Sequence, residues 1–372
     1  MKKSKSTLLK NKSIFEQRIK HVQNTLPHPG QAVFFDHPID LFYLLGLHMS
    51  EGKLFIYNEG AHLFVDGRYI QMADTRSPVP VSLTGHDAEA DFFLKNHIKK
   101  LHFDSKQLTY DDYLKLKSFS QKMESRSSAP LTIVPVPSPL KDLKAVKDIY
   151  ELDLMRKSAK LLWKSFQHLK KILKTGMSET QAAMEFEQFG RKHGAEKMAF
   201  DPIVAFGQNS AMPHYHTGEA KLKKNDVALI DIGLVVEGYH SDMTRVLFFG
   251  SGDPFLNKMY GIVKEAQKAA LKLCKPGIAV KELDLAARSV MNKHGVEQYF
   301  IHSLGHGIGL ETHEPPRIKW NGEDKEMILR PGMLITIEPG LYFPGKGGLR
   351  YEDTIIINEH SYENLFPQKS LP

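Results

Sequence analysis

The chain has 372 residues, of which 41% are hydrophobic and 25% charged, and these values are typical of a globular protein with room for two domains. No apolar run reaches the roughly 18 residues of a membrane-spanning helix, and the basic start Met1–Ser6 lacks the apolar stretch of a secretory signal. The net charge of +7 comes from scattered lysines rather than a stripe, which argues against nucleic-acid binding. Cys274 is the single cysteine, so no intrachain disulfide can form and a cytoplasmic location is expected.

Residues 1–134 are predicted to form a small α/β domain. Short apolar segments at 31–35, 53–57, 61–65, 101–104 and 131–134 are typical of strands, and helical patterns lie between several of them. Asn58-Glu59-Gly60 between the second and third segments predicts a hairpin turn. No segment here gathers histidines or carboxylates at a spacing that indicates chemistry, so we expect this domain to serve packing and substrate access.

A proline-rich segment follows, and residues 135–147 are predicted to be a linker. Pro135-Val-Pro-Ser-Pro139 holds three prolines in five residues, which favours a stiff connector over a helix or a central strand. Residues 148–372 are predicted to be the second domain. Helical spacing of apolar residues predicts a helix near 150–162, another with a Ser178/Gln181 capping box, and two more at 257–273 and 280–293.

Two aspartates interrupt apolar strand patterns in this second domain. Val227–Val236 carries Asp231, and Tyr239–Phe249 carries Asp242. If Glu237-Gly238 is the turn of a hairpin, residue 231 lies opposite 244, and Asp242 is its diagonal neighbour on the same face. Two carboxylates in an apolar setting need a compensating charge, which a metal ion or an arginine such as Arg245 could supply. We expect the metal.

Three histidines lie close together in Ser303-Leu-Gly-His-Gly-Ile-Gly-Leu-Glu-Thr-His-Glu-Pro-Pro316 and just before it. His302, His306 and His313 accompany Gly305, Gly307 and Gly309, and glycines allow sharp turns and close approach to a ligand. A plain glycine-rich loop with exposed histidines is the alternative interpretation.

The carboxy-terminal strands add two glutamates. Met333–Glu338 predicts a strand that ends at Glu338, and Gly348–Ile357 predicts one strand that places Arg350 and Glu352 on one face. Asp231, Asp242, His306, Glu338 and Glu352 could together hold two divalent ions. An oxygen-rich set with one nitrogen favours Mn²⁺, with Co²⁺, Fe²⁺ or Zn²⁺ as alternatives, and two such ions can activate water for hydrolysis.

These motifs resemble the metallopeptidase family with the pita-bread fold, and the match covers nearly the whole chain. The resemblance is carried by Asp231 and Ser-Asp242-Met-Thr-Arg, by Gly-His306-Gly-Ile-Gly, by Ile-Glu338-Pro-Gly-Leu-Tyr and by Arg-Tyr-Glu352-Asp. It is closest to the Xaa-Pro aminopeptidase and Xaa-Pro dipeptidase (prolidase) branch, because Phe34–Tyr69 resembles its creatinase-like amino-terminal domain. The implied fold class is α/β (α+β), with that small domain followed by a pita-bread catalytic domain.

The resemblance also implies residue roles. Asp231 would bind one metal, His306 and Glu338 would complete the other site, and Asp242 and Glu352 would bridge the ions. Glu338 is also the candidate that handles the proton of the attacking water. His214 is similar to a histidine that stabilises the transition state, His313 to one that meets the peptide carbonyl, and His302 to a further histidine of the substrate pocket. Tyr342 and Arg350 match a tyrosine and an arginine close to the metals.

Three functions are compatible with these residues. Release of the first residue from peptides with proline second is the leading hypothesis, and a dipeptidase is the runner-up, because no arginine can be singled out to bind a free carboxylate. Arg317 follows Pro315-Pro316 but could equally be a surface charge. A pita-bread binding protein without activity is the third hypothesis, and methionine aminopeptidase is disfavoured because it lacks the amino-terminal domain. Peptides are the expected partners, together with self-association into a homodimer or higher oligomer.

Overall fold

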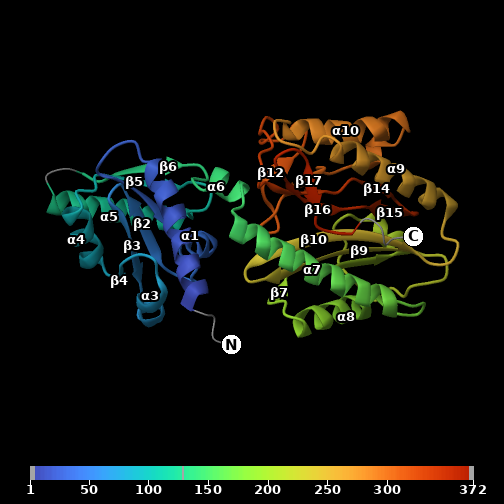
Figure 1. Cartoon of the computed structure of the whole chain (residues 1–372), viewed down its shortest axis with the longest axis horizontal. Coiled ribbons are helices and arrows are strands. Elements are labelled where there is room, and N and C mark those ends of the chain that lie inside the picture. Colours follow the sequence, from blue (N-terminus) through green and yellow to red (C-terminus); the bar gives the residue numbers. More distant parts are fainter. Residues whose placement is uncertain (1–4, 128–129, 368–372) are drawn as a thin grey trace. The chain divides into compact units, whose positions relative to one another are not determined.

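The structure is a computed structural model that describes residues 5–127 and 130–367. It divides into two compact units, Met1–Leu143 and Lys144–Pro372. Each unit has its own sheet structure (Figure 1) and its own core of buried hydrophobic side chains.

The first unit is built on a six-stranded mixed sheet with the strand order β4-β3-β2-β1-β5-β6. Phenylalanines of α4 and α5 pack with those of β1, β2, β3 and β5 in one aromatic core. The elements are α1 (Lys5–Asn24), β1 (Gln31–Phe35), α2 (Pro38–Leu45), β2 (Lys53–Tyr57), β3 (Gly60–Val65), α3 (Ile70–Arg76), β4 (Val81–Leu83), α4 (His86–Lys95), β5 (Lys100–Asp104), α5 (Tyr110–Arg126) and β6 (Thr132–Val136).

The predicted strands and hairpin of this unit are present, with one difference at the proline-rich segment. β2 and β3 pair antiparallel with Tyr57 opposite Gly60, as the turn signal indicated. Pro135, however, lies within β6 and pairs with Phe103. A proline is tolerated there because β6 is an edge strand, where one side of the backbone needs no ladder hydrogen bond. The helix α6 (Lys141–Ala145) follows and crosses the division between the units.

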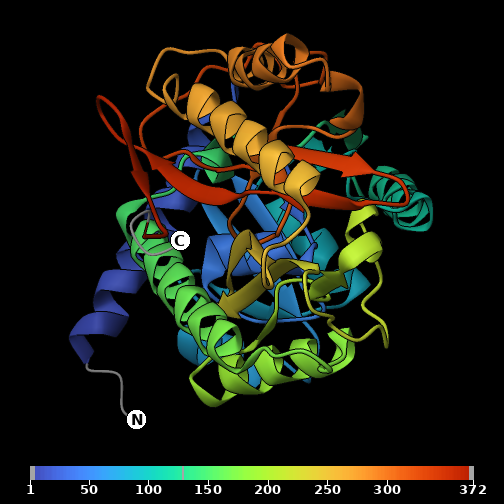
Figure 2. The same ribbon diagram turned by 90° about the vertical axis from the view of Figure 1, so that its right-hand side faces the viewer.

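The second unit contains two helix pairs with strands between them (Figure 2). α7 packs on β9 and β10 and against α8, whereas α9 packs against α10 and on β13, β14 and β15. Its elements are α7 (Ile149–Ile172), α8 (Glu179–Lys192), β7 (Lys197–Met198), β8 (Ile203–Phe206), η1 (Gly207–Ala211), β9 (Val227–Val236), β10 (Tyr239–Phe248), α9 (Pro254–Leu271), α10 (Val280–Lys293), η2 (Glu297–Tyr299), β11 (Gly305–Gly307), β12 (Glu314–Ile318), β13 (Leu334–Ile337), β14 (Gly340–Phe343), β15 (Gly347–Arg350), β16 (Asp353–Ile357) and β17 (Tyr362–Asn364).

Three strand groups result from this arrangement. One sheet has the order β10-β9-β7 with β8 also paired to β9, another runs β12-β11-β13-β16-β17, and β14 pairs with β15. The capping box at the start of α8 is present, with Ser178 bonded to the backbone of Gln181 and the reverse contact also made.

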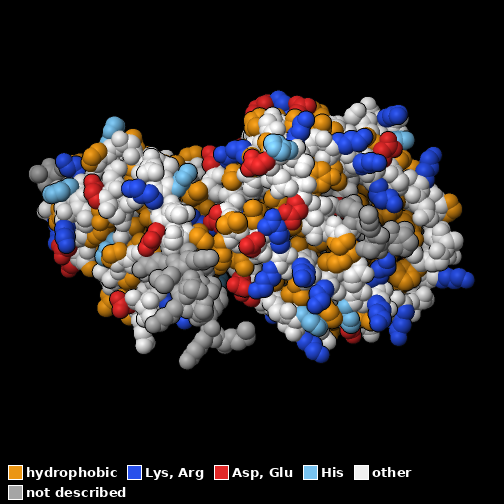
Figure 3. Space-filling model, viewed as in Figure 1, with side chains coloured by type: hydrophobic (Ala, Val, Ile, Leu, Met, Phe, Trp, Pro, Cys, Tyr) orange, Lys and Arg blue, Asp and Glu red, His pale blue; other side chains and the backbone are white. Residues whose placement is uncertain are grey.

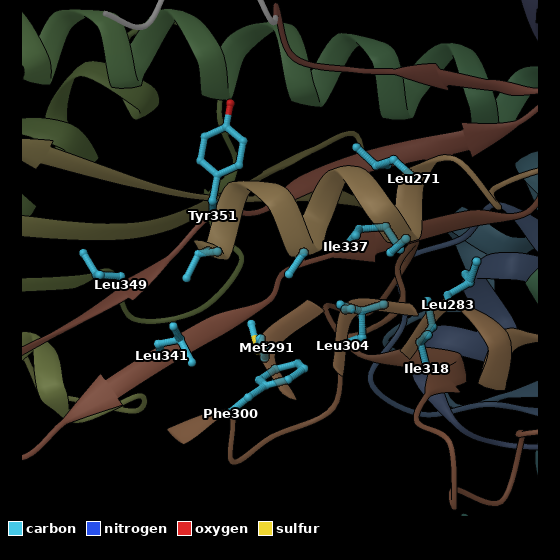
Figure 4. Packing of buried hydrophobic residues seen from close by; sticks show 14 of the residues in the cluster. Leu271, Leu283, Met291, Phe300, Leu304, Ile318, Ile337, Leu341, Leu349 and Tyr351 are labelled. Atoms are coloured by element: carbon cyan, nitrogen blue, oxygen red, sulfur yellow. The ribbon is translucent and has the colours of Figure 1, made fainter. Parts of the chain in front are cut away.

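The core under α9 and α10 is closed by apolar side chains from strands of the carboxy-terminal sheet. Leu283 and Met291 of α10 pack with Ile318, Ile337 and the neighbouring cluster residues that Figure 4 shows. Burial of apolar surface stabilises a fold by about 25 cal/mol per Å², so the packing of these side chains stabilises the position of the strands beneath the helices. Glu338 and Glu352 lie directly beside the ends of strands in this region.

Acidic, basic and apolar side chains are interspersed on the face shown in Figure 3. Within the described ranges, no helix has the length and apolar character needed to span a membrane.

Candidate metal centre and substrate cavity

The hairpin of β9 and β10 brings the two aspartates together. The strands are antiparallel with Asp231 opposite Thr244 and Asp242 opposite Gly233, so the predicted register is confirmed. Glu237 and Gly238 both have positive φ, 49° and 83°, as a two-residue turn of this kind requires. Both carboxylates are buried on one face of the hairpin, at 9% and 4% exposure.

His306 reaches the same place from β11. Its Nε2 atom lies 3.8 Å from Asp242 Oδ2 and 3.4 Å from Glu338 Oε1. Its Nδ1 atom lies 2.9 Å from the Gly307 carbonyl, which can only accept a hydrogen bond, so the proton is on Nδ1 and the Nε2 lone pair is free to bind a cation. Burial lowers the pKa of His306 to about 3, which keeps the ring neutral.

The glycines around His306 serve close packing of strands rather than a loop. Gly305 and Gly307 belong to β11, and neither has positive φ. A Cβ on Gly305 would lie 2.0 Å from the Thr336 carbonyl oxygen, and one on Gly307 would lie 2.3 Å from the Pro315 carbonyl oxygen. The interpretation of this stretch as a turning loop is therefore wrong for these two positions, because the close approach is to neighbouring protein backbone.

The two glutamates lie just outside the ends of strands. Glu338 follows β13, and Glu352 lies between β15 and β16. The prediction of one strand over Gly348–Ile357 is wrong, because β15 pairs with β14 whereas β16 pairs with β13. At residues 351 and 352 the chain passes from pairing with β14 to pairing with β13. Arg350 and Glu352 therefore reach the same site because the chain crosses between two strand pairs here, and not because their side chains alternate along one strand.

Clustering of these acids changes their protonation. Burial, followed by the charge of Glu352, raises the pKa of Asp242 well above its usual range, and the same two causes act on Glu338. Burial and the charge of Asp231 raise the pKa of Glu352 to about 8. Such shifts arise where like charges share a site that lacks enough cations.

The donor set fits a divalent cation. One ligand atom each from Asp242, His306 and Glu352 lie within 4.8 Å of one another. Three buried carboxylate oxygens in this cluster, Asp231 Oδ1, Asp242 Oδ1 and Glu352 Oε1, have no hydrogen-bond partner. Buried polar atoms are rarely left unpaired, so three unpaired oxygens that face one cluster point to a cation as their partner.

Arg350 is the cation that the protein itself provides. It donates to Asp231 Oδ2 at 2.5 Å, to Tyr342 Oη at 2.6 Å and to Thr244 Oγ1 at 3.0 Å. Thr244 in turn donates to Glu352 Oε2 at 2.6 Å. Arg245, the alternative partner for the aspartates, instead pairs with Asp353 at 2.6 Å.

A cavity of about 930 Å³ opens over this cluster. His214, His302 and His313 line it, with His313 packed edge-on against His306 at 4.4 Å between ring centres. Tyr342 lies behind the wall, where its hydroxyl is 2.9 Å from His302 Nε2. The structure thus brings all the predicted site residues together around one cavity; the roles assigned to each remain predictions.

Two residues near the cavity, Thr244 and Glu179, were not predicted to take part, and Arg317 was considered but could not be distinguished from a surface charge. Thr244 links Arg350 to Glu352, and its position opposite Asp231 was the one signal the sequence contained. Glu179 is buried beside the segment that carries His214, and Arg317 lines the cavity mouth. Only the three-dimensional arrangement distinguishes the last two from ordinary charged residues.

Comparison with known proteins identifies the family. Residues 153–359 match metallopeptidase family M24, and residues 18–133 match the creatinase/prolidase N-terminal domain. This chain belongs to metallopeptidase family M24. A Pyrococcus furiosus Xaa-Pro dipeptidase is 34% identical to it over 334 residues, which cover 90% of this chain and 92% of the relative.

Solved structures agree with this assignment. An Xaa-Pro dipeptidase from Bacillus anthracis superposes with a TM-score of 0.87 at 29% identity and covers 96% of this chain and 98% of that one. An X-Pro aminopeptidase from Thermotoga maritima superposes with a TM-score of 0.84 at 28% identity, with 95% and 98% covered. The predicted fold, a creatinase-like amino-terminal domain followed by a pita-bread catalytic domain, is confirmed, and the chain is a metallopeptidase.

Proposed function

We propose that this metallopeptidase is an Xaa-Pro dipeptidase. The sequence favoured an aminopeptidase, because no positive group for a free carboxylate could be singled out. The names of the similar Pyrococcus and Bacillus proteins support the dipeptidase instead. Arg317 is the observation that carries the proposal.

Arg317 has the position and the free charge that carboxylate recognition needs. In β12 the burial alternates, and Pro315 and Arg317 are the exposed residues. Arg317 lines the cavity, and its charge lowers the pKa of His313 after the larger effect of burial, so the two side chains share one region. The described residues provide no ion-pair partner for its guanidinium, which leaves it available for the carboxylate of a dipeptide.

The metal ligands proposed from the sequence fit two ions by charge. The cluster contains four carboxylates and one arginine, a formal charge of −3, so one divalent ion leaves −1, whereas two ions with one shared hydroxide would leave 0. Two divalent ions, with Mn²⁺ favoured by the oxygen-rich donors, would supply Lewis-acid activation of water and of the peptide carbonyl. The residues that would hold them are Asp231, Asp242, His306, Glu338 and Glu352.

The remaining side chains would orient the substrate and move protons. Glu338 Oε1 lies 3.4 Å from His306 Nε2, and its carboxylate would take the proton of the attacking water. His313 and His214 face the cavity, where an imidazole N–H can stabilise the developing oxyanion. Arg350 holds Asp231 in place, and Tyr342 holds His302.

The test compares an Xaa-Pro dipeptide with its amide, which lacks the negative charge of the terminal carboxylate. Wild-type protein loaded with Mn²⁺ is assayed with Xaa-Pro, with Xaa-Pro amide and with an Xaa-Pro-Xaa tripeptide, with and without chelator. A charged hydrogen bond is worth about 1.5–3 kcal/mol, so Arg317→Met should lower kcat/KM for the dipeptide by about 10- to 100-fold and leave the amide unchanged. Lys325→Met, at an exposed position outside the cavity lining, is the control.

An aminopeptidase remains the second candidate because the Thermotoga structure is so similar. Equal turnover of the tripeptide, with no effect of Arg317→Met, would establish it. Hydrolysis that survives the chelator, or no hydrolysis of any of these peptides, would contradict both.

A further inference from the structure

A buried carboxylate outside the metal cluster has an unusual set of partners. Glu179 is the first residue of α8 and is fully buried, at 0% exposure. Its Oε1 atom accepts from Phe206 N at 2.7 Å and from Asn209 Nδ2 at 2.9 Å. Its Oε2 atom accepts from Tyr215 Oη at 2.8 Å and from Gly218 N at 3.2 Å. Both oxygens therefore act only as acceptors, each for two donors.

Glu179 forms no ion pair with any residue in the described ranges, although a buried charge is costly without compensation. Four donors and the partial positive charge of the α8 amino terminus supply that compensation. An apolar side chain in this space would leave the Phe206 and Gly218 N–H groups without their acceptor, so the carboxylate serves this segment through its acceptor contacts.

The four donors surround the segment that carries His214. Phe206 ends β8 where this segment begins, and Gly218 lies where it ends, and both backbone N–H groups point at the same carboxylate. Asn209 and Tyr215 are anchored between them. Thr180, the next residue of α8, adds a 2.7 Å hydrogen bond from its Oγ1 to the Gly218 carbonyl.

His214 itself has no anchor of its own. It is exposed on the cavity side and forms no hydrogen bond with another described residue. His214 nonetheless lines the same cavity as His302 and His313, so it belongs to the group of cavity histidines. Its place is therefore set by the backbone on either side, which Glu179 holds through its four donors. Arg350 also donates to the Pro213 carbonyl at 3.5 Å, and Thr217 Oγ1 donates to the Pro202 carbonyl at 2.6 Å.

We propose that Glu179 is the positioning residue of His214: its carboxylate closes the 206–218 segment into a fixed loop that presents His214 to the substrate. This inference rests on the proposed function for the role of His214, whereas the ordering of the loop stands independently. A misplacement of about 1 Å at a catalytic group can cost up to about 100-fold in rate, so such an anchor is part of the catalytic geometry.

Glu179→Gln is the informative variant because it keeps the shape and changes only the acceptor count. An amide has one acceptor oxygen, and its NH₂ group must face either Phe206 N–H or Gly218 N–H, which then loses its acceptor. In Mn²⁺-loaded protein without substrate, we expect amide hydrogen exchange in 206–218 to become about tenfold or more faster, with no change in 302–316. Glu185→Gln, the same substitution elsewhere in α8 and outside the cavity lining, should change neither region.

Kinetics test whether the loop acts through His214. With the peptide that the wild type cleaves, we expect Glu179→Gln to lower kcat about tenfold and change KM less than about threefold, with metal content unchanged. In a His214→Ala background the same substitution should lower kcat by less than about twofold further, because the group it positions is gone. Asn209→Ala removes one donor from outside the cavity and should give the same changes to a smaller degree.

The outcomes separate this inference from the proposed substrate. Unchanged exchange in 206–218 overturns the inference whatever the activity. Faster exchange with unchanged kcat, or a full additional loss in the His214→Ala background, overturns the positioning role. Failure to cleave Xaa-Pro dipeptides contradicts the proposed function alone, since the exchange measurement needs no substrate.

Discussion

Removal of metal should make stability depend on pH through Glu352. Burial and the charge of Asp231 raise the pKa of this carboxyl from 4.5 to about 8 in the metal-free site. An acid with a raised pKa in the folded state stabilises the fold while it is protonated, and the contribution is lost as the pH rises through the folded value. With these two values, the metal-free protein should lose about 2 kcal/mol of unfolding free energy between about pH 6 and pH 8.

The assay is thermal unfolding with and without chelator at both pH values. For a unit of this size, about 2 kcal/mol corresponds to a fall in Tm of about 4–8 °C. Glu352→Gln cannot ionise and should make this fall smaller, while the raised pKa values of Asp242 and Glu338 leave a residual pH dependence. Mn²⁺ should raise the Tm of the wild type more at the higher pH, where protons compete less with the metal for the carboxylates. Identical pH slopes for metal-free wild type and Glu352→Gln would refute the reasoning.

Further predictions concern the ligands and the strand packing around them. Asp242→Asn should lose metal by elemental analysis and abolish hydrolysis while circular dichroism stays unchanged, and normal metal content would contradict its assignment. His306→Ala should lose metal, whereas His313→Ala should keep it and lose turnover, so equal loss from both would show that the ligand set is wrong. Gly305→Ala should destabilise by about 1–3 kcal/mol in denaturant unfolding because its Cβ would meet neighbouring backbone at 2.0 Å. Gly261→Ala, in an open helical position, should be neutral or stabilising by up to about 1 kcal/mol, and a similar loss there would remove the steric explanation.

The hairpin of the aspartates could be predicted because its register depends on local sequence alone. A two-residue turn at Glu237 and Gly238 fixes every opposing pair, so the shared face of Asp231 and Asp242 follows by counting. Helices such as α10 were predictable for a similar reason, since apolar periodicity and flanking signals are local. Both predictions needed no knowledge of distant parts of the chain.

Features that depend on distant parts of the chain were missed or misread. The change of strand partner at Glu352 depends on β13 and β14, which no pattern within 348–357 encodes. Gly305 looked like a loop residue because its steric neighbour, Thr336, is 31 positions away. Glu179 could not be distinguished from other first-turn acids, because its donors lie 27 to 39 residues further along.

The ion pair of Arg245 with Asp353 lies one residue along the chain from the contact of Thr244 with Glu352, and on the opposite side from the carboxylate cluster. Thr244 and Arg245 are consecutive in β10, and Glu352 directly precedes Asp353, the first residue of β16. Thr244 donates to Glu352 on the cavity side, whereas Arg245 pairs with Asp353 at 2.6 Å on the opposite, fully buried side. Asp353 also accepts from Gln267 at 3.1 Å, so both of its oxygens have donors, while Glu352 Oε1 has none. The contact between β10 and β16, which belong to different sheets, thus contains a saturated charge pair that joins the two sheets and, one residue away, a carboxylate oxygen without a donor that is held in position to bind a cation.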